Sequence, residues 1–331
     1  MIDRISIFGT GLLGGSVGLA LRAAGYKGSI VGVNRGPEQA RIALEMGAID
    51  SIAADPLEAA RQSQVIVLAV PVYATLDWME KLSGVLGPDQ LVTDVGSTKR
   101  MISEAAARLY NSPRRAGFLP GHPMAGKERS GAALASADLF QGTVWLFTPW
   151  PVGQAVSGEG ENLQAAEEPG RGQFCNKGTA LAGPQTLQNE SGALAPEGAS
   201  GASKELMKEW RQWVAAMGSR VLDLDPVRHD EMVAWVSHLP QFVSTALSAL
   251  LEEEIGEAPE LKDVGGRALR EMTRLGASPY SMWRDIALTN TAPVELALQK
   301  LEQRLALLRE NLRTQILREE FDQANKFRRN C

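Results

Sequence analysis

Short apolar runs rich in β-branched residues alternate with segments of helical periodicity over the first 149 residues. The strand-like runs are ISIFG from Ile5, SIVGV from Ser29, VIVLAV from Val65 and LVTDV from Leu91. The helical segments cover residues 15–24, 37–46, 75–86 and 99–109. Because the strand-like runs are apolar on both faces, they are typical of strands buried between two helix layers. This order predicts an α/β fold with a doubly wound, mostly parallel sheet of the Rossmann type.

Two later apolar runs, VWLF at 144–147 and VLDL at 221–224, are expected to add strands to the same sheet. Between them, residues 151–203 are rich in Gly, Ala, Glu, Gln, Ser and Pro and have no sustained periodicity. Such a composition predicts a flexible insertion that does not contribute to the core. We therefore expect that it can be deleted without loss of activity or stability.

The remainder of the chain has helical periodicity. Asp225 is a candidate N-cap before Pro226, and the following segment can be helical over residues 227–254. The last helix is expected to bury one apolar face formed by Leu301, Leu305, Leu308, Leu312 and Ile316. We predict a dinucleotide-binding domain over residues 1–225, including the insertion, and an all-α substrate and dimerisation domain over residues 226–331.

Composition and charge favour a soluble protein that acts on small molecules. The 331 residues carry a net charge of −5 made of mixed charges, which argues against a nucleic-acid or polybasic membrane surface. No signal peptide and no apolar run of about 20 residues is present in the sequence, so we expect a cytoplasmic location. The two cysteines have no disulfide or metal-ligand spacing, and no metal is expected.

The first chemical motif is G-x-G-x-x-G, formed by Gly9, Gly11 and Gly14 between a predicted strand and a predicted helix. In this context the glycines allow a tight turn, close backbone approach to a pyrophosphate and close helix packing. The pattern predicts a dinucleotide site, although a glycine-rich turn without ligand would read the same way. The residues expected to contact the cofactor are Gly9, Gly11, Leu12, Leu13, Gly14, Asn34, Arg35, Val70 and Pro71.

The residue after the second predicted strand bears on the choice between NAD and NADP. An acidic residue that would bind a ribose 2′-hydroxyl is absent, and the chain reads Val33-Asn34-Arg35-Gly36. Arg35 can pair with a 2′-phosphate, lie over an adenine or remain solvated. We expect NADP or NAD, with NADP favoured.

His122 is the leading candidate for a general base. It follows the strand-like residues 116–119 in GHPMAG, which we expect to be a loop at the carboxyl edge of the sheet. A neutral imidazole with a pKa of about 6.5 suits removal of a hydroxyl proton at neutral pH. Ser97, in DVGSTK, is expected either to reach His122 or a substrate hydroxyl or to cap the following helix, and these roles are compatible.

Two arginines form a candidate anion site. Arg270 and Arg274 lie one helical turn apart, so both guanidinium groups can point toward one carboxylate, or each can pair with a nearby acidic side chain. The other histidines, His229 and His238, do not have metal-ligand spacing, and we interpret them first as packing or supporting residues.

Taken in order, these motifs resemble the prephenate and arogenate dehydrogenases of tyrosine biosynthesis. The resemblance rests on GTGLLGGS, TDVGSTK, GHPMAGKERSG, SHLP and TRLGASPYSMWRDI, and it covers most of the chain outside residues 151–203. GHPMAG-x-E-x-SG is the most specific of these pieces.

The resemblance implies oxidative decarboxylation of prephenate to 4-hydroxyphenylpyruvate, or of arogenate to tyrosine, with hydride transfer to NAD(P). It implies that His122 deprotonates the ring hydroxyl and that Ser97 bonds the same hydroxyl. It further implies that Arg274 binds the ring carboxylate and that Glu128 lies near the substrate side chain. His238, Gln241 and Arg270 complete the expected substrate-binding set, and a homodimer built through the helical domain is expected.

Several points remain open from the sequence. Gln241 stands where many members have a histidine, and Gly265-Gly266-Arg267 replaces a run of three glycines, so the substrate side chain is not defined. No chorismate mutase segment and no appended regulatory domain are expected. A β-hydroxyacid dehydrogenase and a non-enzymatic NADP-binding regulator are the alternatives. Of the three activities, only the dehydrogenation of prephenate or arogenate predicts release of CO2 and a phenol.

Overall fold

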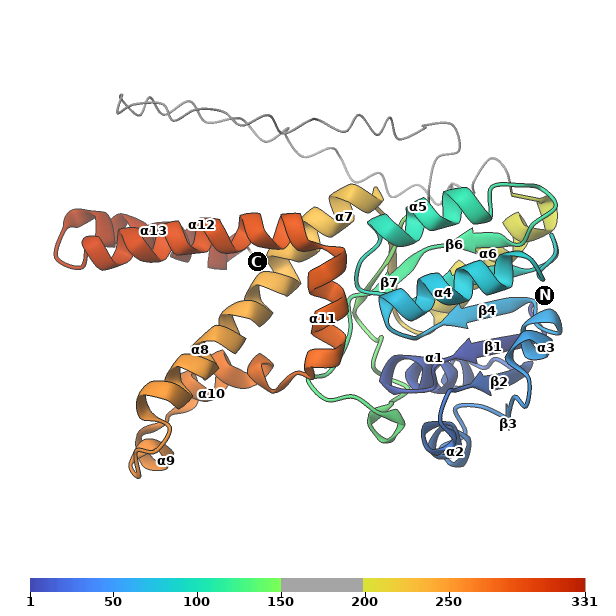
Figure 1. Ribbon diagram of the computed structural model, residues 1–331, viewed down its shortest axis with the longest axis horizontal. Helices are drawn as coiled ribbons and strands as arrows, with labels where there is room; N and C mark the ends of the chain where they lie inside the picture. The colour runs from blue at the N-terminus through green and yellow to red at the C-terminus, as the bar shows by residue number, and fades with distance from the viewer. Residues whose placement is uncertain (150–198, 331) are drawn as a thin grey trace.

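Six parallel strands form the central sheet of the protein. The computed structural model describes residues 1–149 and 199–330. The strand order is β3-β2-β1-β4-β5-β6, and every neighbouring pair is parallel (Figure 1). The predicted Rossmann-type sheet is therefore confirmed. Its strands are β1 (Arg4–Phe8), β2 (Ser29–Val33), β3 (Ser51–Ile52), β4 (Val65–Leu68), β5 (Leu91–Asp94) and β6 (Gly117–Leu119).

Helices cover both faces of this sheet, because its strands are apolar on both sides. In β4, Val65 and Val67 join one buried apolar cluster, whereas Ile66 and Leu68 join the other, as the two-residue period of a strand requires. The first cluster includes α1 (Leu12–Ala23), α2 (Pro37–Glu45) and α6 (Gly201–Ala216). The second includes α3 (Pro56–Arg61), α4 (Val72–Ser83) and α5 (Arg100–Leu109).

The four predicted helices correspond to α1, α2, α4 and α5, whereas β3, α3 and α6 were not predicted. The two residues of β3 are both exposed, so the strand has no apolar pattern to detect. The helix α6 starts at Gly201 and is capped by Ser200, whose side chain accepts a hydrogen bond from the Ser203 N–H. The predicted insertion, which ends at about residue 203, therefore overlaps the first residues of α6. The part of the insertion before residue 199 lies outside the described residues.

The later apolar runs do not extend the main sheet, which corrects the prediction. They form β8 (Val144–Phe147) and β9 (Arg220–Asp223) of a separate three-stranded sheet whose third member is β7 (Gly121–Pro123). Pro120, which has no N–H to donate, lies between β6 and β7 and interrupts the strand. His122 accordingly lies in a short strand, antiparallel to β8 and opposite Leu146, and not in the expected loop.

The helical part begins as predicted at Asp225. Its carboxylate accepts hydrogen bonds from the Val227 and Arg228 N–H groups at 2.9 and 3.0 Å. The predicted helical segment to residue 254 is present, with one π-helical turn inside it. The elements are α7 (Pro226–Val233), the π-helix η2 (Ala234–His238), α8 (Leu239–Ile255), α9 (Leu261–Val264), α10 (Arg267–Thr273), the 3-10 helix η3 (Arg274–Ala277), α11 (Tyr280–Thr289), α12 (Thr291–Glu310) and α13 (Gln315–Asn330).

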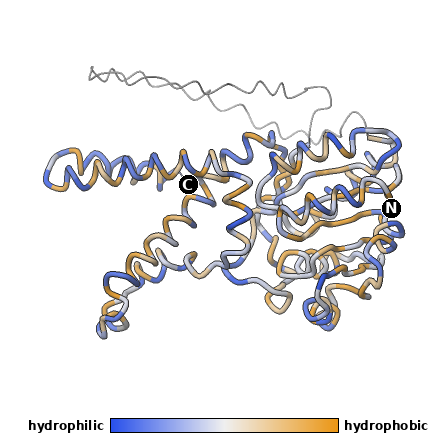
Figure 2. Tube along the Cα trace, viewed as in Figure 1, coloured by the Kyte–Doolittle hydropathy of each residue, from blue (hydrophilic) through white to orange (hydrophobic). Residues whose placement is uncertain are grey.

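The predicted last helix is two helices. α12 ends at Glu310 and α13 begins at Gln315, so the expected apolar face is divided between them, and Leu312 lies in the connection. Leu305, Leu312 and Ile316 are exposed in the single chain. In Figure 1, α8 to α10 and α12 with α13 extend away from the sheet as two arms, and Figure 2 shows apolar positions along both. No helix among the described residues is long and apolar enough to cross a bilayer.

Candidate active site

The glycine motif lies where β1 ends and α1 begins. Gly9 has a φ of +91°, and a Cβ on Gly14 would lie 2.0 Å from the Gly9 carbonyl oxygen, so both positions require glycine. A Cβ on Gly11, in contrast, would meet no heavy atom within 4 Å. Open space therefore borders the N-terminus of α1, where free N–H groups favour an anion.

Side chains around this motif support the same interpretation. The Thr10 hydroxyl oxygen is buried without a hydrogen-bond partner among the described residues, and its N–H donates to Asn34 Oδ1 at 2.7 Å. Asn34 thus holds the glycine loop against the end of β2. Arg35 is exposed and makes no hydrogen bond or ion pair within the described part of the chain. Val70 packs against Gly9, and Pro71 is the N-cap residue of α4.

His122 is buried beside the same edge of the sheet. The Gly121 N–H donates to Asp94 Oδ1 at 3.1 Å, which ties β7 to the last residue of β5. A Cβ on Gly121 would lie 2.8 Å from the Asp94 carbonyl oxygen, so only glycine allows this approach. The carboxyl ends of β1, β2, β4 and β5 therefore bring the glycine motif, Asn34, Val70 and His122 to one edge, where α/β sheets bind ligands.

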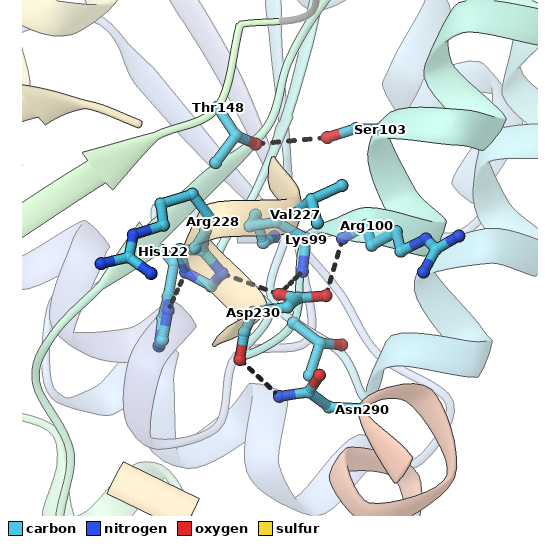
Figure 3. Close-up of polar contacts among 12 residues, drawn as sticks. Lys99, Arg100, Ser103, His122, Thr148, Val227, Arg228, Asp230 and Asn290 are labelled. Atoms are coloured by element: carbon cyan, nitrogen blue, oxygen red, sulfur yellow. Dashed lines mark hydrogen bonds and ion pairs between the residues drawn. The ribbon is translucent and has the colours of Figure 1, made fainter. Parts of the chain in front are cut away.

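A chain of hydrogen bonds extends from His122 into the helical part. His122 Nδ1 lies 2.8 Å from His229 Nε2, and His229 Nδ1 lies 2.8 Å from Asp230 Oδ1. Asp230 also accepts hydrogen bonds from the Lys99 and Arg100 N–H groups at 2.7 and 2.9 Å (Figure 3). His229, interpreted from the sequence as a packing or supporting residue, contacts both His122 and Asp230, and Asp230 is a functional candidate that the sequence analysis missed.

The N-terminus of α5 is consequently capped by Asp230 and not by Ser97. The N-cap residue of α5 is Lys99, which provides no side-chain cap, so the alternative role of Ser97 as a helix cap is wrong. Ser97 is half-buried, and no hydrogen bond from it to His122 is present within residues 1–149 and 199–330. Thr98 instead links α5 to α11 through its hydroxyl, 2.8 Å from that of Thr289.

Burial and neighbouring charges favour the neutral form of His122. Desolvation by burial, followed by the neighbouring His229, Lys99 and His238, holds the pKa of His122 well below its usual range. Burial also lowers the pKa of His229, although the hydrogen bond to Asp230 opposes this shift. Lys99 forms a fully buried ion pair with Asp94, and desolvation lowers the pKa of its amine.

His238 occupies the end of the π-helical turn. Its Nδ1 lies 3.2 Å from Asn290 Nδ2, and its Nε2 is buried without a partner among the described residues. Asn290 Nδ2 also donates to the Asp230 carbonyl oxygen at 2.8 Å, which fixes the amide (Figure 3). Burial lowers the pKa of His238 to about 4. A π-helical turn frequently marks a functional site because it redirects a side chain.

The two candidate arginines do not point toward a common partner. Arg274 forms an ion pair with Glu128, which follows β7. Arg270 is exposed and donates to the Gly265 carbonyl oxygen at 3.1 Å. The expectation that both point the same way fails because α10 ends at Thr273 and Arg274 opens the 3-10 helix η3, which changes the angle between successive side chains.

Gln241 holds the segment that follows Arg274. Its Nε2 donates to the Leu275 carbonyl oxygen at 2.7 Å and to the Thr245 hydroxyl at 3.1 Å, and its Oε1 accepts from the Ser278 hydroxyl at 3.0 Å. The amide is therefore used in fixing η3 on α8. The sequence context of Gln241 did not indicate these bonds.

Fold and site together define a two-part protein with a Rossmann-type nucleotide-binding unit followed by helices. Residues 17–155 match the family model described as prephenate dehydrogenase, nucleotide-binding domain. Residues 225–326 match the family model described as prephenate dehydrogenase, dimerization domain. The chain belongs to the prephenate dehydrogenase family.

Individual relatives agree with this assignment. The chain is 29% identical over 292 residues to the prephenate dehydrogenase of Bacillus subtilis strain 168, with coverage of 88% of this chain and 65% of that protein. It therefore spans about two thirds of the length of that relative. The structure resembles A. aeolicus prephenate dehydrogenase in complex with hydroxyphenyl propionate and NAD+ (TM-score 0.72, 26% identity, covering 100% and 96% of the two chains). It also resembles Synechocystis arogenate dehydrogenase (TM-score 0.67, 25% identity, covering 99% of each).

Proposed function

We propose that the chain catalyses the NAD(P)-dependent oxidative decarboxylation of prephenate or arogenate in tyrosine biosynthesis. The observation that carries this proposal is the Arg274–Glu128 ion pair, which brings the guanidinium from the helical part to the segment that follows the buried His122. A base at His122 and a carboxylate-binding cation held at Glu128 suit a ring with a hydroxyl and a carboxylate.

The residues at the glycine motif fit a dinucleotide. The open space at Gly11, the free start of α1 and the unpartnered Thr10 hydroxyl suit a pyrophosphate. When bound, the nicotinamide supplies the acceptor for the hydride that leaves the substrate carbon. We favour NADP because Arg35 is exposed and free of partners within the described residues, at the position that meets the ribose.

Each of three side chains has a separate role in the proposed reaction. His122 takes the proton from the ring hydroxyl, for which its neutral state at physiological pH is required. Ser97 donates to or accepts from the same hydroxyl. Arg274 exchanges the Glu128 carboxylate for the ring carboxylate of the substrate. As the hydroxyl carbon becomes a carbonyl, the bond to that carboxylate breaks, CO2 leaves and the ring becomes aromatic.

The rest of the substrate-binding set is assigned in the same way. The unpartnered Nε2 of His238 is a hydrogen-bonding group for the substrate, and Glu128 lies near the substrate side chain once Arg274 has turned to the ring carboxylate. Gln241 acts through Arg274. Arg270 is exposed, and we assign it to the vicinity of a dimer interface and not to direct contact with the substrate.

A homodimer formed through the helical part accompanies this function. The arms expose large apolar side chains, including Leu250 on α8, Leu296 on α12 and Phe321 on α13. Groups of exposed large apolar side chains are typical of protein interfaces. We place the division between the two domains at residue 225, in front of α7, and the protein in the cytoplasm.

The proposal is tested by assaying the purified protein with prephenate and with arogenate, each with NAD and with NADP. Reduced cofactor, CO2 and the phenolic product are measured together. We expect equal amounts of all three with one of the two substrates. Cofactor reduction with a simple β-hydroxyacid and no CO2 would overturn the proposal. Cofactor binding without turnover of any of these acids would also overturn it. For the NADP preference, Arg35→Ala should raise the KM for NADP about tenfold or more and leave that for NAD unchanged.

A further inference from the structure

The side chain of Asp230 can only accept hydrogen bonds where it meets the backbone. Its Oδ1 accepts from the Lys99 N–H at 2.7 Å and its Oδ2 from the Arg100 N–H at 2.9 Å (Figure 3). Both donors belong to the start of α5, where the helix dipole favours a negative charge. The carboxylate is therefore fixed as an acceptor. This determines the donor and the acceptor in the hydrogen bonds from Asp230 to His229 and from His229 to His122.

The Asp230 carboxylate next determines which ring nitrogen of His229 donates and which accepts a hydrogen bond. Asp230 Oδ1 lies 2.8 Å from His229 Nδ1, so this nitrogen must carry the hydrogen. Burial keeps the ring neutral because it lowers the pKa of His229. A neutral imidazole with its hydrogen on Nδ1 has a lone pair on Nε2. His229 Nε2 is thus an acceptor, and it lies 2.8 Å from His122 Nδ1.

We propose that His229 and Asp230 are positioning residues that hold His122 in the Nδ1–H tautomer, with the lone pair on Nε2 free to take the substrate proton. The proposal rests on the proposed function for the role of His122 as base, whereas the tautomer itself follows from the hydrogen bonds together with the neutral state of the buried His229. In isolation, neutral histidine favours the hydrogen on Nε2, so the tautomer expected here must be imposed by its partner.

The same chain accommodates the proton once it has been transferred. The substrate O–H bond breaks, an N–H bond forms at His122 Nε2, and the ring becomes a cation that already donates through Nδ1 to His229. Asp230 favours a positive charge on His229, the partner of His122, whereas burial, His229 itself, Lys99 before α5 and His238 on η2 disfavour a charge on His122. Asp94 on β5 offsets Lys99 through their buried ion pair. No proton has to leave this set of hydrogen-bonded side chains during the step.

The protein offers a direct readout because it contains only three histidines. Uniform 15N labelling of histidine and long-range 1H–15N correlation spectra separate the Nδ1–H, Nε2–H and doubly protonated forms of each ring. The spectra are recorded on the full chain near neutral pH, and His122→Asn and His238→Gln assign the signals. We expect both His122 and His229 in the Nδ1–H form. An Nε2–H form of His122 in the unaltered protein would overturn the proposal.

A variant then tests the dependence of His122 on His229. His229→Leu removes the acceptor, so His122 should revert to Nε2–H and kcat should fall by about 10²- to 10⁴-fold, as for other bases held in the wrong tautomer. The dissociation constant for the cofactor should not change. In the control His238→Gln, which alters a buried histidine outside the chain of bonds, His122 should keep its tautomer. If His229→Leu leaves the tautomer or kcat unaltered, the proposal is wrong.

The outcomes also separate this proposal from the proposed function. If the unaltered protein turns over neither substrate but His122 has the Nδ1–H form, the function fails and the tautomer assignment stands. If turnover is normal and His122 has the Nε2–H form, the function stands and the positioning role fails. If His229→Leu does not fold, the spectrum of the unaltered protein still decides the question.

Discussion

Arg274 of the helical part forms an ion pair with Glu128, six residues after His122 in the chain. The pair joins η3 to the segment that leaves the small sheet, and no part of it is deeply buried. In the proposed function, a substrate carboxylate that displaces Glu128 leaves the guanidinium paired, so entry does not strand a positive charge. This relationship links the proposed anion site to the proposed base.

Replacing Arg274 should weaken substrate binding more than it slows chemistry. A charge-assisted hydrogen bond is worth about 1.5 to 3 kcal/mol, so Arg274→Ala should raise KM by about 10- to 100-fold. Arg270→Ala is the matched control, because Arg270 bonds a backbone carbonyl and not Glu128. Steady-state kinetics of both variants provide the measurement. An unchanged KM in Arg274→Ala would show that another residue holds the carboxylate.

The glycine motif offers a pair of substitutions with opposite expected effects. Gly14→Ala places a methyl group 2.0 Å from the Gly9 carbonyl oxygen, so the melting temperature should fall. Gly11→Ala meets no protein atom within 4 Å, so it should keep the melting temperature of the parent but weaken cofactor binding. Thermal unfolding and fluorescence titration with the cofactor compare the two. Unaltered cofactor affinity in Gly11→Ala would argue against a pyrophosphate at this position.

The glycine motif also shows which parts of the candidate site can be predicted from the sequence. The roles of Gly9 and Gly14 depend on local backbone geometry, and β1 and α1 lie next to them in the chain, so the pattern alone predicts them. The doubly wound parallel sheet follows similarly from alternating apolar runs. His122 was identified by its motif, although its strand was not, because three residues after a proline carry no periodicity.

The contacts across the chain could not be predicted. Asp230 caps α5 from 131 residues away, and nothing in the sequence states which distant side chain reaches a helix start. Gln241 was expected to bind substrate, and its bonds to η3 became visible only when α8 and η3 were placed together. Likewise, the common direction of Arg270 and Arg274 assumed one continuous helix, whereas the helix type changes at Arg274.

Acid pH should destabilise the folded chain through His238. Its pKa is about 4 in the folded protein and about 6.5 when unfolded, because burial disfavours the charged ring. The unfolded chain therefore binds a proton that the folded chain does not. The contribution to stability is full above about pH 6.5 and is lost as the pH falls toward about 4.

Urea unfolding of the parent and of His238→Gln, measured at about pH 6.5 and at about pH 4, isolates the contribution of His238 to stability. The difference in unfolding free energy between the two proteins should change by about 3 kcal/mol across the range. The carboxylates titrate in both proteins and cancel in the comparison. A difference that does not vary with pH would show that His238 is not held neutral by burial.

The most direct test of the account is the turnover of His122→Asn with whichever of prephenate and arogenate the unaltered protein is found to convert. Asparagine keeps a polar side chain but cannot take the hydroxyl proton, so kcat should fall by about 10²- to 10⁴-fold. Cofactor affinity, measured by fluorescence titration, should stay at the parental value, because the glycine motif is unaltered. A kcat within a few-fold of the parent would contradict the assignment of His122 as the base.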